Sequence, residues 1–191
     1  MKIHYNSPVV LTFAIIAVVV FLLSAVFSER ITTTLFLVRP SFSFSDPLDY
    51  FRLVSHVVGH ASFQHLFGNL TLILLLGPIL EEKYGSTAIL SIMGVTALTT
   101  GVINVLFFST ALLGASGIVF AFIILASIVN MRRDAIPLSF LLVSLIFIGG
   151  ELLQVFQQDN ISQTAHIVGG IIGAVFGFQL TRSRGQYVQE W

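Results

Sequence analysis

The chain has 191 residues, of which 55% are hydrophobic and only 9% charged, and its formal net charge is zero. A soluble domain carries about 25% charged residues, so this composition excludes an ordinary soluble protein and predicts a membrane protein. The sequence has no cysteine, which excludes disulfides, thiolate metal ligands and a cysteine nucleophile. It has no basic cluster with interleaved aromatic residues either, so nucleic-acid binding is not expected. We expect a single membrane domain over residues 1–191, because no linker rich in Gly, Ser or Pro divides the chain.

The first apolar run extends from Val9 to Phe27 and is long enough to cross a bilayer. Its 19 residues approach the ~20 that a helix needs to span the hydrocarbon core. A cleaved signal peptide is the alternative, but the positively charged start is thin, with Lys2 alone, and no A-x-A site follows the run. The run therefore predicts a first transmembrane helix.

Residues 31–64 form a different kind of segment, in which charged and polar residues are mixed with aromatic ones. Such segments lie in the plane of the membrane interface more readily than they cross it. We therefore expect a long interfacial first loop.

Five further apolar segments follow this loop, at residues 66–80, 87–108, 117–131, 135–153 and 165–180. Together with the first run they predict an all-α, polytopic bundle of six transmembrane helices. Lys and Arg favour the cytoplasmic ends of membrane helices. Six crossings would place Lys2, Lys83, Arg132 and Arg182 on one side, so both termini are expected in the cytoplasm.

Three polar side chains share one depth in the predicted bundle. His65, Ser116 and His166 are each followed 16 positions later by a charged residue, namely Glu81, Arg132 and Arg182. At a rise of 1.5 Å per residue each lies ~24 Å from that charge, inside the ~30 Å hydrocarbon core. Polar side chains are costly in a membrane and tend to face a cavity or a functional site. The common depth therefore predicts one cavity for all three.

Ser116 stands in the tetrapeptide Gly114-Ala115-Ser116-Gly117, where small residues permit a tight turn that exposes a hydroxyl. Such a cluster can also serve only helix packing. His166 is the candidate general base, since a serine hydroxyl is a weak nucleophile until an imidazole removes its proton. Gly169 and Gly173 follow His166 at a spacing of four, which lets that helix approach a neighbour closely.

His65 and Asn69 are spaced i,i+4 and so lie on one helix face. Their side chains, with the backbone N–H of Ser116, are candidates for an oxyanion hole, which acyl transfer needs where negative charge develops. Alternatively, Asn69 bonds a neighbouring helix, as polar residues in membrane bundles do.

His56 and His60 form a second i,i+4 pair and raise the possibility of zinc. The segment His56-Val57-Val58-Gly59-His60 lacks the Glu that H-E-x-x-H uses as a base, so we favour no metal. These histidines are instead expected to fold the first loop through hydrogen bonds to backbone carbonyls.

These residues together resemble the rhomboid intramembrane serine proteases of the bacterial GlpG type. The matching positions are Phe51-Arg52, His56, His60, His65, Asn69, Glu82 to Gly85, Gly114 to Gly117, and Ala165 to Gly169. The resemblance implies a six-helix fold, a catalytic dyad of Ser116 and His166, and an oxyanion hole from His65, Asn69 and Ser116. It also implies that Arg52 belongs to the structure of the first loop.

The activity implied by the resemblance is cleavage of transmembrane segments of membrane-protein substrates in a bacterial inner membrane, without metal or other cofactor. Two features depart from the family pattern. Phe120 stands where close relatives have a tyrosine beside the catalytic histidine, and the soluble cytoplasmic domain of some relatives is not seen ahead of the first helix.

Two other functions are weighed against this one. A non-catalytic rhomboid-like protein that binds transmembrane clients would usually lack the serine or the histidine, and both are present. A small membrane transporter would often show internal inverted repeats, which the sequence does not.

Two expectations concern the end of the fifth segment. Residues 154–164 are expected to form a mobile loop that caps the cavity. Glu151, the one carboxylate of that segment, reaches a depth that permits a catalytic triad. We expect it to take no part, because it stands beside this loop and the resemblance implies a dyad.

Overall fold

The computed structural model describes residues 4–27, 30–108, 110–129, 136–155 and 160–187, with backbone alone for 147–155, 160–163 and 181–187. Eight α-helices account for most of these residues and no strand occurs among them. They are α1 (Pro8–Phe27), α2 (Arg30–Leu35), α3 (Pro47–Ser55), α4 (Phe63–Tyr84), α5 (Ser86–Phe107), α6 (Ser116–Ile128), α7 (Leu138–Val155) and α8 (Asn160–Tyr187). The predicted all-α class is therefore confirmed.

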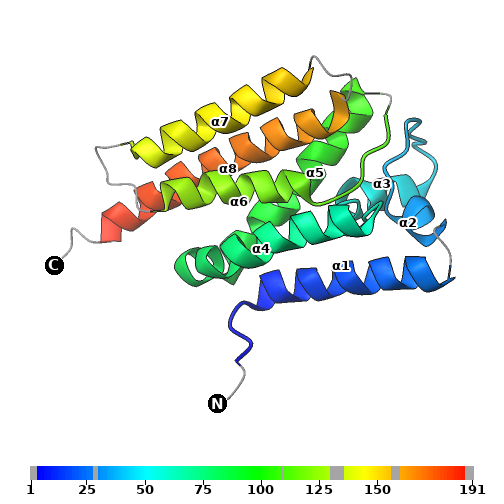
Figure 1. Cartoon of the computed structure of the whole chain (residues 1–191), viewed down its shortest axis with the longest axis horizontal. Helices are drawn as coiled ribbons and strands as arrows, with labels where there is room; N and C mark the ends of the chain where they lie inside the picture. The colour runs from blue at the N-terminus through cyan, green and yellow to red at the C-terminus, as the bar shows by residue number, and fades with distance from the viewer. Residues whose placement is uncertain (1–3, 28–29, 109, 130–135, 156–159, 188–191) are drawn as a thin grey trace.

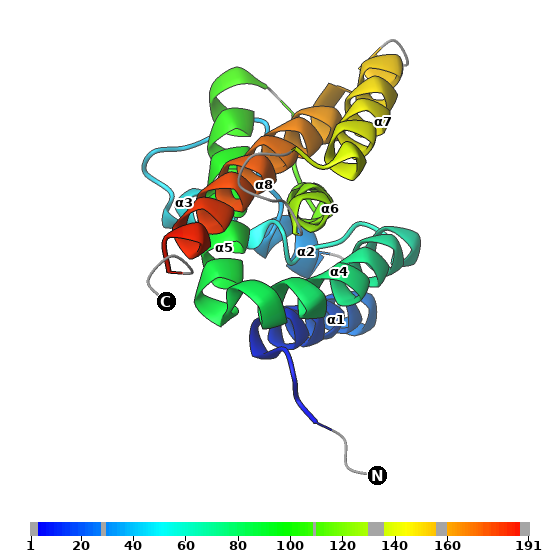
Figure 2. The same ribbon diagram turned by 90° about the vertical axis from the view of Figure 1, so that its left-hand side faces the viewer.

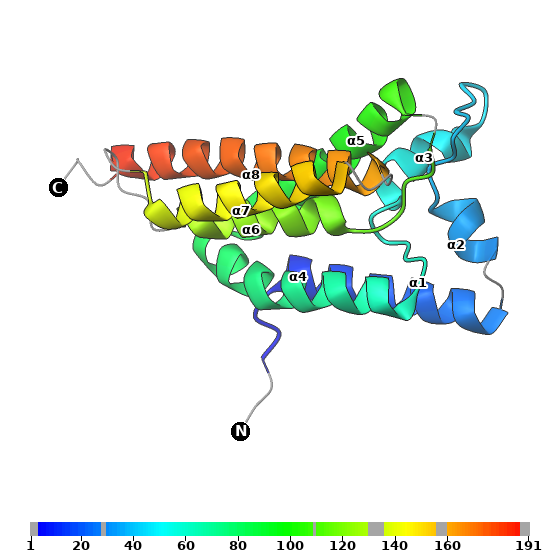
Figure 3. The same ribbon diagram turned by 45° about the horizontal axis from the view of Figure 1, so that its top comes forward.

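α1, α4, α6, α7 and α8 share one general direction, α5 crosses them obliquely, and α2 and α3 lie together at one end of the bundle (Figures 1 and 2). The start of α1 and the end of α8 lie at the opposite end (Figures 1 and 3). Viewed along the bundle, α6 occupies the middle, with α4, α5, α7 and α8 around it (Figure 2). The core accordingly collects on α6, where Ile118, Phe122 and Leu125 are fully buried.

Helix length separates the central helix from those at the edge. Three described helices, α1, α4 and α5, are long and apolar enough to cross a membrane. α6 has only 13 residues and the apolar part of α8 runs from Thr164 to Leu180. At 1.5 Å per residue α6 is ~20 Å long, which is shorter than the ~30 Å hydrocarbon core of a bilayer. The count of six membrane crossings stays a prediction.

The predicted first loop contains two short helices, and α3 has an unusual distribution of polarity. Asp46 caps its start by accepting the N–H of Leu48 at 3.0 Å, and Pro47 occupies its first turn, a position that needs no N–H donor. Asp49 and Arg52 are buried, whereas Phe51 and Val54 are about half exposed. α3 therefore turns its polar face toward the protein and its apolar face outward.

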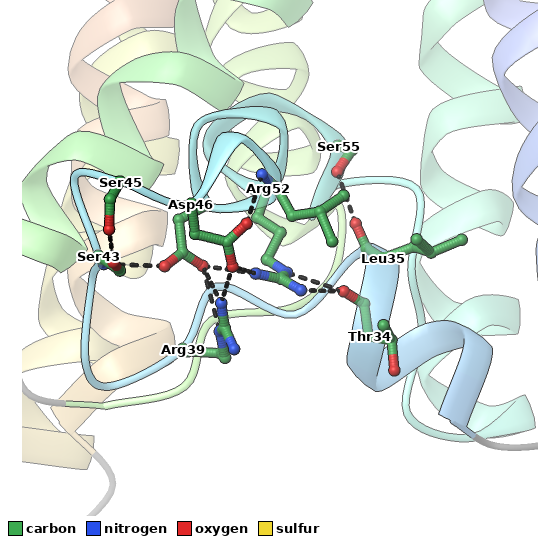
Figure 4. Close-up of polar contacts among 10 residues, drawn as sticks. Thr34, Leu35, Arg39, Ser43, Ser45, Asp46, Arg52 and Ser55 are labelled. Carbon is green, nitrogen blue, oxygen red and sulfur yellow. Dashed lines mark hydrogen bonds and ion pairs between the residues drawn. The ribbon is translucent and has the colours of Figure 1, made fainter.

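A cluster of four charged side chains holds α3 against α2 (Figure 4). Asp49 accepts from Arg39 at 2.9 Å and from Arg52 at 2.5 Å, and the Arg52 guanidinium also donates to the carbonyl of Thr34 at 2.8 Å. Asp46 accepts from Arg39 at 2.5 Å. Asp49 and Arg52 form the buried part of the cluster, where each charge is paired with an opposite one, while Arg39 and Asp46 are partly exposed.

Burial acts to raise the pKa of Asp49, but hydrogen bonds from the N–H of Ser43, from Arg39 and from Arg52 outweigh it, and the pKa is lowered. A carboxyl group with a lowered pKa stabilises the folded state above its unfolded value of ~3.9. That stabilisation is lost as the pH falls through the folded pKa.

Glu81 links the start of α1 to the turn between α4 and α5 through hydrogen bonds. Its buried carboxylate accepts the backbone N–H groups of Val9 and Val10, each at 3.0 Å, and the hydroxyl of Ser86 at 2.7 Å. The first N–H groups of a helix have no partner inside the helix, and a negative charge there is favoured by the helix dipole. Glu81 thus acts as an N-terminal cap for a helix distant in sequence.

Backbones touch where α6 and α8 pack together. A Cβ atom on Gly169 would overlap the carbonyl oxygen of Gly117, and one on Gly173 would overlap that of Ala121. The predicted close approach through Gly169 and Gly173 is therefore present, and it is made against α6.

The end of the fifth segment differs from the sequence-based expectation. Residues 154 and 155 belong to α7 and residues 160–164 to α8, so the expected loop over 154–164 is wrong for those positions. The apolar run ends before the helix does, because polar residues such as Gln154 also tolerate helical geometry. Residues 156–159 lie outside the described residues.

We predict that Glu81→Gln destabilises the protein by roughly 1–3 kcal/mol, because one carboxylate acceptor becomes an amide donor facing backbone N–H groups. Thermal or denaturant unfolding in detergent micelles measures the effect. Glu82→Gln is the matched control, since Glu82 is exposed in the same helix turn. Equal unfolding midpoints for the two variants would contradict the role of Glu81 as the N-terminal cap of α1.

We predict that Gly173→Ala lowers stability by roughly 1–3 kcal/mol, because the added methyl group forces α8 away from the backbone of α6. Gly170→Ala is the control, because its Cβ would meet Ile124 Cγ1 at an ordinary 3.6 Å. The same unfolding assay compares them. A Gly173→Ala protein as stable as Gly170→Ala would show that the contact tolerates separation.

Candidate active site

Ser116 is the first residue of α6 and follows a turn that only glycine fits well. Gly114 has φ +112°, a conformation that L side chains rarely adopt, and a Cβ there would overlap the imidazole of His65. Ser116 itself is half-buried. The first hydrogen bond of the helix runs from Val119 N–H to the carbonyl of Ala115 at 3.0 Å. The N–H groups of Ser116, Gly117 and Ile118 therefore lie at the open, electropositive end of α6.

The segment before Ser116 is pinned to the rest of the protein at several points. Val38 and Leu112 exchange two backbone hydrogen bonds, at 3.0 and 3.1 Å, and Gly114 N–H donates to the carbonyl of His56 at 2.9 Å. Asn104 donates from its side chain to the carbonyl of Thr110 at 2.8 Å. The position of the serine thus depends on the first loop and on α5.

His166 lies on α8 opposite the Ser116 end of α6. Its imidazole stacks on the ring of Phe120, with centroids 4.1 Å apart and an interplanar angle of 5°. Phe120 is four residues after Ser116 and so shares its helix face. Immediately after Ser116 and immediately before His166 the two backbones are close, because a Cβ on Gly117 would lie 3.2 Å from the carbonyl oxygen of Ala165. The structure therefore brings Ser116 and His166 to facing sides of one interface.

His65 joins the same place from α4. Its backbone N–H donates to the capping hydroxyl of Ser62 at 3.2 Å, which fixes the start of the helix. Its ring fills the space left by the missing side chain of Gly114, and its centroid is 5.0 Å from that of His60. His65 is also close enough to His166 to interact with it electrostatically. Three of the predicted side chains thus converge at one level.

Asn69 is buried and binds the first loop. Its Nδ2 lies 3.0 Å from Nε2 of His60, whose Nδ1 lies 3.1 Å from the carbonyl of Val58. A carbonyl accepts only, so His60 carries its proton on Nδ1 and Nε2 accepts one hydrogen of the Asn69 amide. The second amide hydrogen of Asn69 is left for another acceptor.

His56 and His60 are both buried and both neutral at pH 7. Burial lowers the pKa of His56 to about 4, and burial with the nearby His65 lowers the pKa of His60 to about 4. A neutral His60 is what the bond from Asn69 requires. Because these values lie below the ordinary ~6.5, the associated stability is full above that pH and is lost as the pH falls toward 4.

His56 donates from Nδ1 to the carbonyl of Arg52 at 3.2 Å, and its Nε2 lies 3.3 Å from the Thr100 hydroxyl. The ring nitrogens of His56 and His60 are therefore occupied by backbone and side-chain partners. Among the described residues no group of three or more His, Asp or Glu is arranged to hold a metal.

Several residues that hold this site were not found from the sequence. Thr96, Thr100 and Asn104 are buried on α5 at a spacing of four, and Thr100 and Asn104 contact His56 and Thr110. A polar stripe of this spacing in an apolar helix was the available signal. The bonds between His60 and Asn69 and between Val38 and Leu112 have no such signal. Glu151 lies in α7, and its side chain is outside the described part.

Comparisons with known proteins agree with this architecture. A model of the Rhomboid domain matches residues 47–183, which is more than half of the chain. The chain is similar to the rhomboid protease GlpG of Haemophilus influenzae, with 26% identity over 133 residues that cover 68% of this chain and 69% of that protein. The rhomboid proteases GlpG of Yersinia pestis and Yersinia pseudotuberculosis are 25% identical over 187 residues, 96% of this chain and 66% of theirs. Because the domain match runs from the first loop to the last helix, this chain belongs to the rhomboid family of polytopic membrane proteins.

Proposed function

We propose that this protein is an intramembrane serine endopeptidase that cleaves transmembrane segments of other membrane proteins with a dyad of Ser116 and His166. The observation that supports the proposal is the stacking of His166 on Phe120, one helical turn after Ser116, across the tight interface of α6 and α8. The names of the relatives, rhomboid proteases, support the same activity.

In the proposed reaction the Ser116 hydroxyl attacks the scissile carbonyl while His166 accepts its proton. His166 then returns the proton to the leaving amine, and water hydrolyses the acyl-enzyme. The stacked ring of Phe120 restricts rotation of the His166 imidazole. A face-to-face aromatic contact therefore supplies orientation that a carboxylate provides in a triad.

The oxyanion that forms on the substrate is proposed to accept hydrogen bonds from the Ser116 N–H and from the second Nδ2 hydrogen of Asn69. His65 is proposed as a third donor, because its ring lies between Gly114 and His60, which are two residues before Ser116 and bonded to Asn69 respectively. One such donor is worth about 3–4 kcal/mol of barrier. His60 is proposed as a positioning residue, because its bond leaves the Asn69 amide only one free direction.

The substrate and its setting follow from the depth of the site. Peptide carbonyls in an intact helix are already hydrogen-bonded, so the substrate helix must unwind locally before attack. Gly or Pro near the cleaved bond would ease unwinding. We place the protein in a bacterial inner membrane with six crossings and both termini in the cytoplasm. The start of α1 and the end of α8 lie at one end of the bundle, which supports an even number of crossings.

We predict that Ser116→Ala and His166→Ala each lower kcat for a transmembrane substrate by at least about 10⁴-fold, because either change removes the nucleophile or its base. A fluorophosphonate should label the wild-type protein and fail to label Ser116→Ala.

Ser91→Ala is the control for these variants, since this exposed serine only donates to the carbonyl of Thr87 on α5. It should keep both cleavage and labelling. Turnover by purified Ser116→Ala would refute the protease proposal. A wild-type protein that binds transmembrane peptides and neither cleaves nor labels would favour the client-binding alternative.

We predict that Asn69→Ala lowers kcat by roughly 10²–10³-fold with little change in KM, because an oxyanion donor acts on the transition state. His60→Ala should lower kcat in the same way, and the double variant should be little worse than Asn69→Ala alone.

Steady-state kinetics on a quenched transmembrane peptide measure both parameters. If the losses of kcat in the two single variants add up in the double variant, His60 does not act through Asn69. A raised KM with unchanged kcat would make Asn69 a binding or packing residue instead.

A further inference from the structure

A cavity of about 640 Å³ lies under the first loop, between α1, α3 and α5. Its walls come from the first half of α1, including Val9 and Phe13, and from the first half of α5, including Met93 and Gly94. α3 forms its roof with Phe51 and Val54. α3 packs directly against the backbone of α5, because a Cβ on Gly101 of α5 would overlap the Leu53 carbonyl oxygen. This contact sets the position of α3 over the cavity.

The cavity offers little for water to bind. Thr12 and Ser55 are the polar side chains in its lining, and both hydroxyls already have partners. Thr12 bonds the hydroxyl of Tyr5 at 2.9 Å, and Ser55 donates to the carbonyl of Leu35 at 3.2 Å. A buried water needs two to four polar partners, so this lining favours an apolar occupant over water.

The rim of the cavity continues into the surface that faces lipid. Ile16 on α1, Leu90 on α5, and Phe51 and Val54 on α3 line the cavity and are all exposed. α1 and α5 are both long and apolar enough to cross the membrane. In a bilayer the opening therefore meets acyl chains directly.

Size decides between the two apolar occupants that a membrane supplies. A transmembrane helix about 30 Å long and 10–12 Å wide fills roughly 2,400–3,400 Å³, several times the cavity. The cavity falls within the ~300–1,000 Å³ range of sites for small ligands. A single acyl chain is thin and flexible enough to enter it, and an empty cavity would leave its lining without packing partners.

We propose that this cavity binds one acyl chain of a membrane phospholipid, drawn from the leaflet on the side where α1 and α5 begin. The acyl chain lies between α1 and α5 and packs against Phe51 and Val54 of α3. It thereby supports the first loop, in which Val57 and Val58 line the cavity between His56 and His60. The binding is independent of the proposed protease activity.

The test uses the full chain in lipid nanodiscs that contain a phosphatidylethanolamine with a photoactivatable diazirine on its acyl chain. After irradiation, adducts are mapped by peptide mass spectrometry. We expect adducts on residues of the cavity wall, such as Phe13 and Met93, in addition to those on exposed lipid-facing residues such as Leu75 of α4.

Gly94→Leu fills the cavity, because Gly94 lines it and a Cβ there meets no atom within 4 Å. It should lower the adducts on Phe13 and Met93 at least fivefold relative to those on Leu75. Gly68→Leu on α4 is the matched control, since its Cβ also meets no atom within 4 Å and Gly68 is not part of the lining.

Loss of wall adducts in Gly94→Leu alone supports the proposal. Wall adducts that are absent from the wild type, unchanged in Gly94→Leu, or lowered equally by Gly68→Leu would overturn it. Gly94→Val makes the same test with a smaller side chain if Gly94→Leu does not fold. Because labelling is read without substrate, a failure of the protease proposal leaves this result unaffected.

Discussion

The direct contact of the α6 and α8 backbones is the constraint on which the rest of the site depends. At Gly169 and Gly173 no side chain separates the two helices. The imidazole of His166 and the ring of Phe120 can then stack at 4.1 Å, and the start of α6 faces α8. A single methyl group at this contact would push the helices apart by more than a hydrogen bond between the proposed partners tolerates. Small residues in a membrane helix thus set a distance in addition to allowing association.

The parts around this contact position α6 from both ends. At one end, the turn at Gly114 is held by His65, by His56 and by the pairing of Val38 with Leu112. At the other end, Lys83 of α4 donates to the carbonyl of Val129, which follows the helix. A cation there also suits the negative end of the helix dipole. α6 is therefore a short helix whose two ends are both fixed by polar contacts inside a largely apolar bundle.

Sequence reasoning located the helices well because an apolar run reports directly where a chain crosses a bilayer. It also brought together His65, Ser116 and His166, since helical rise converts spacing along the chain into depth. It failed where a helix contains polar residues, because apolarity no longer marks the helix there. Residues 160–164 are such a case, since they belong to α8. It could not pair His60 with Asn69, because contacts between a loop and a helix follow no period.

The arrangement of α3 means that the first loop is solvated differently from the loops of a soluble protein. Its charged residues satisfy one another inside, at Asp49 and Arg52, and its Phe51 and Val54 meet whatever apolar medium surrounds the protein. The medium is thus a structural component of the loop, as water is for an ordinary surface turn. Detergents whose tails pack poorly in this region should loosen the loop while leaving the helix bundle intact, so the two parts of the protein have separate solvent requirements.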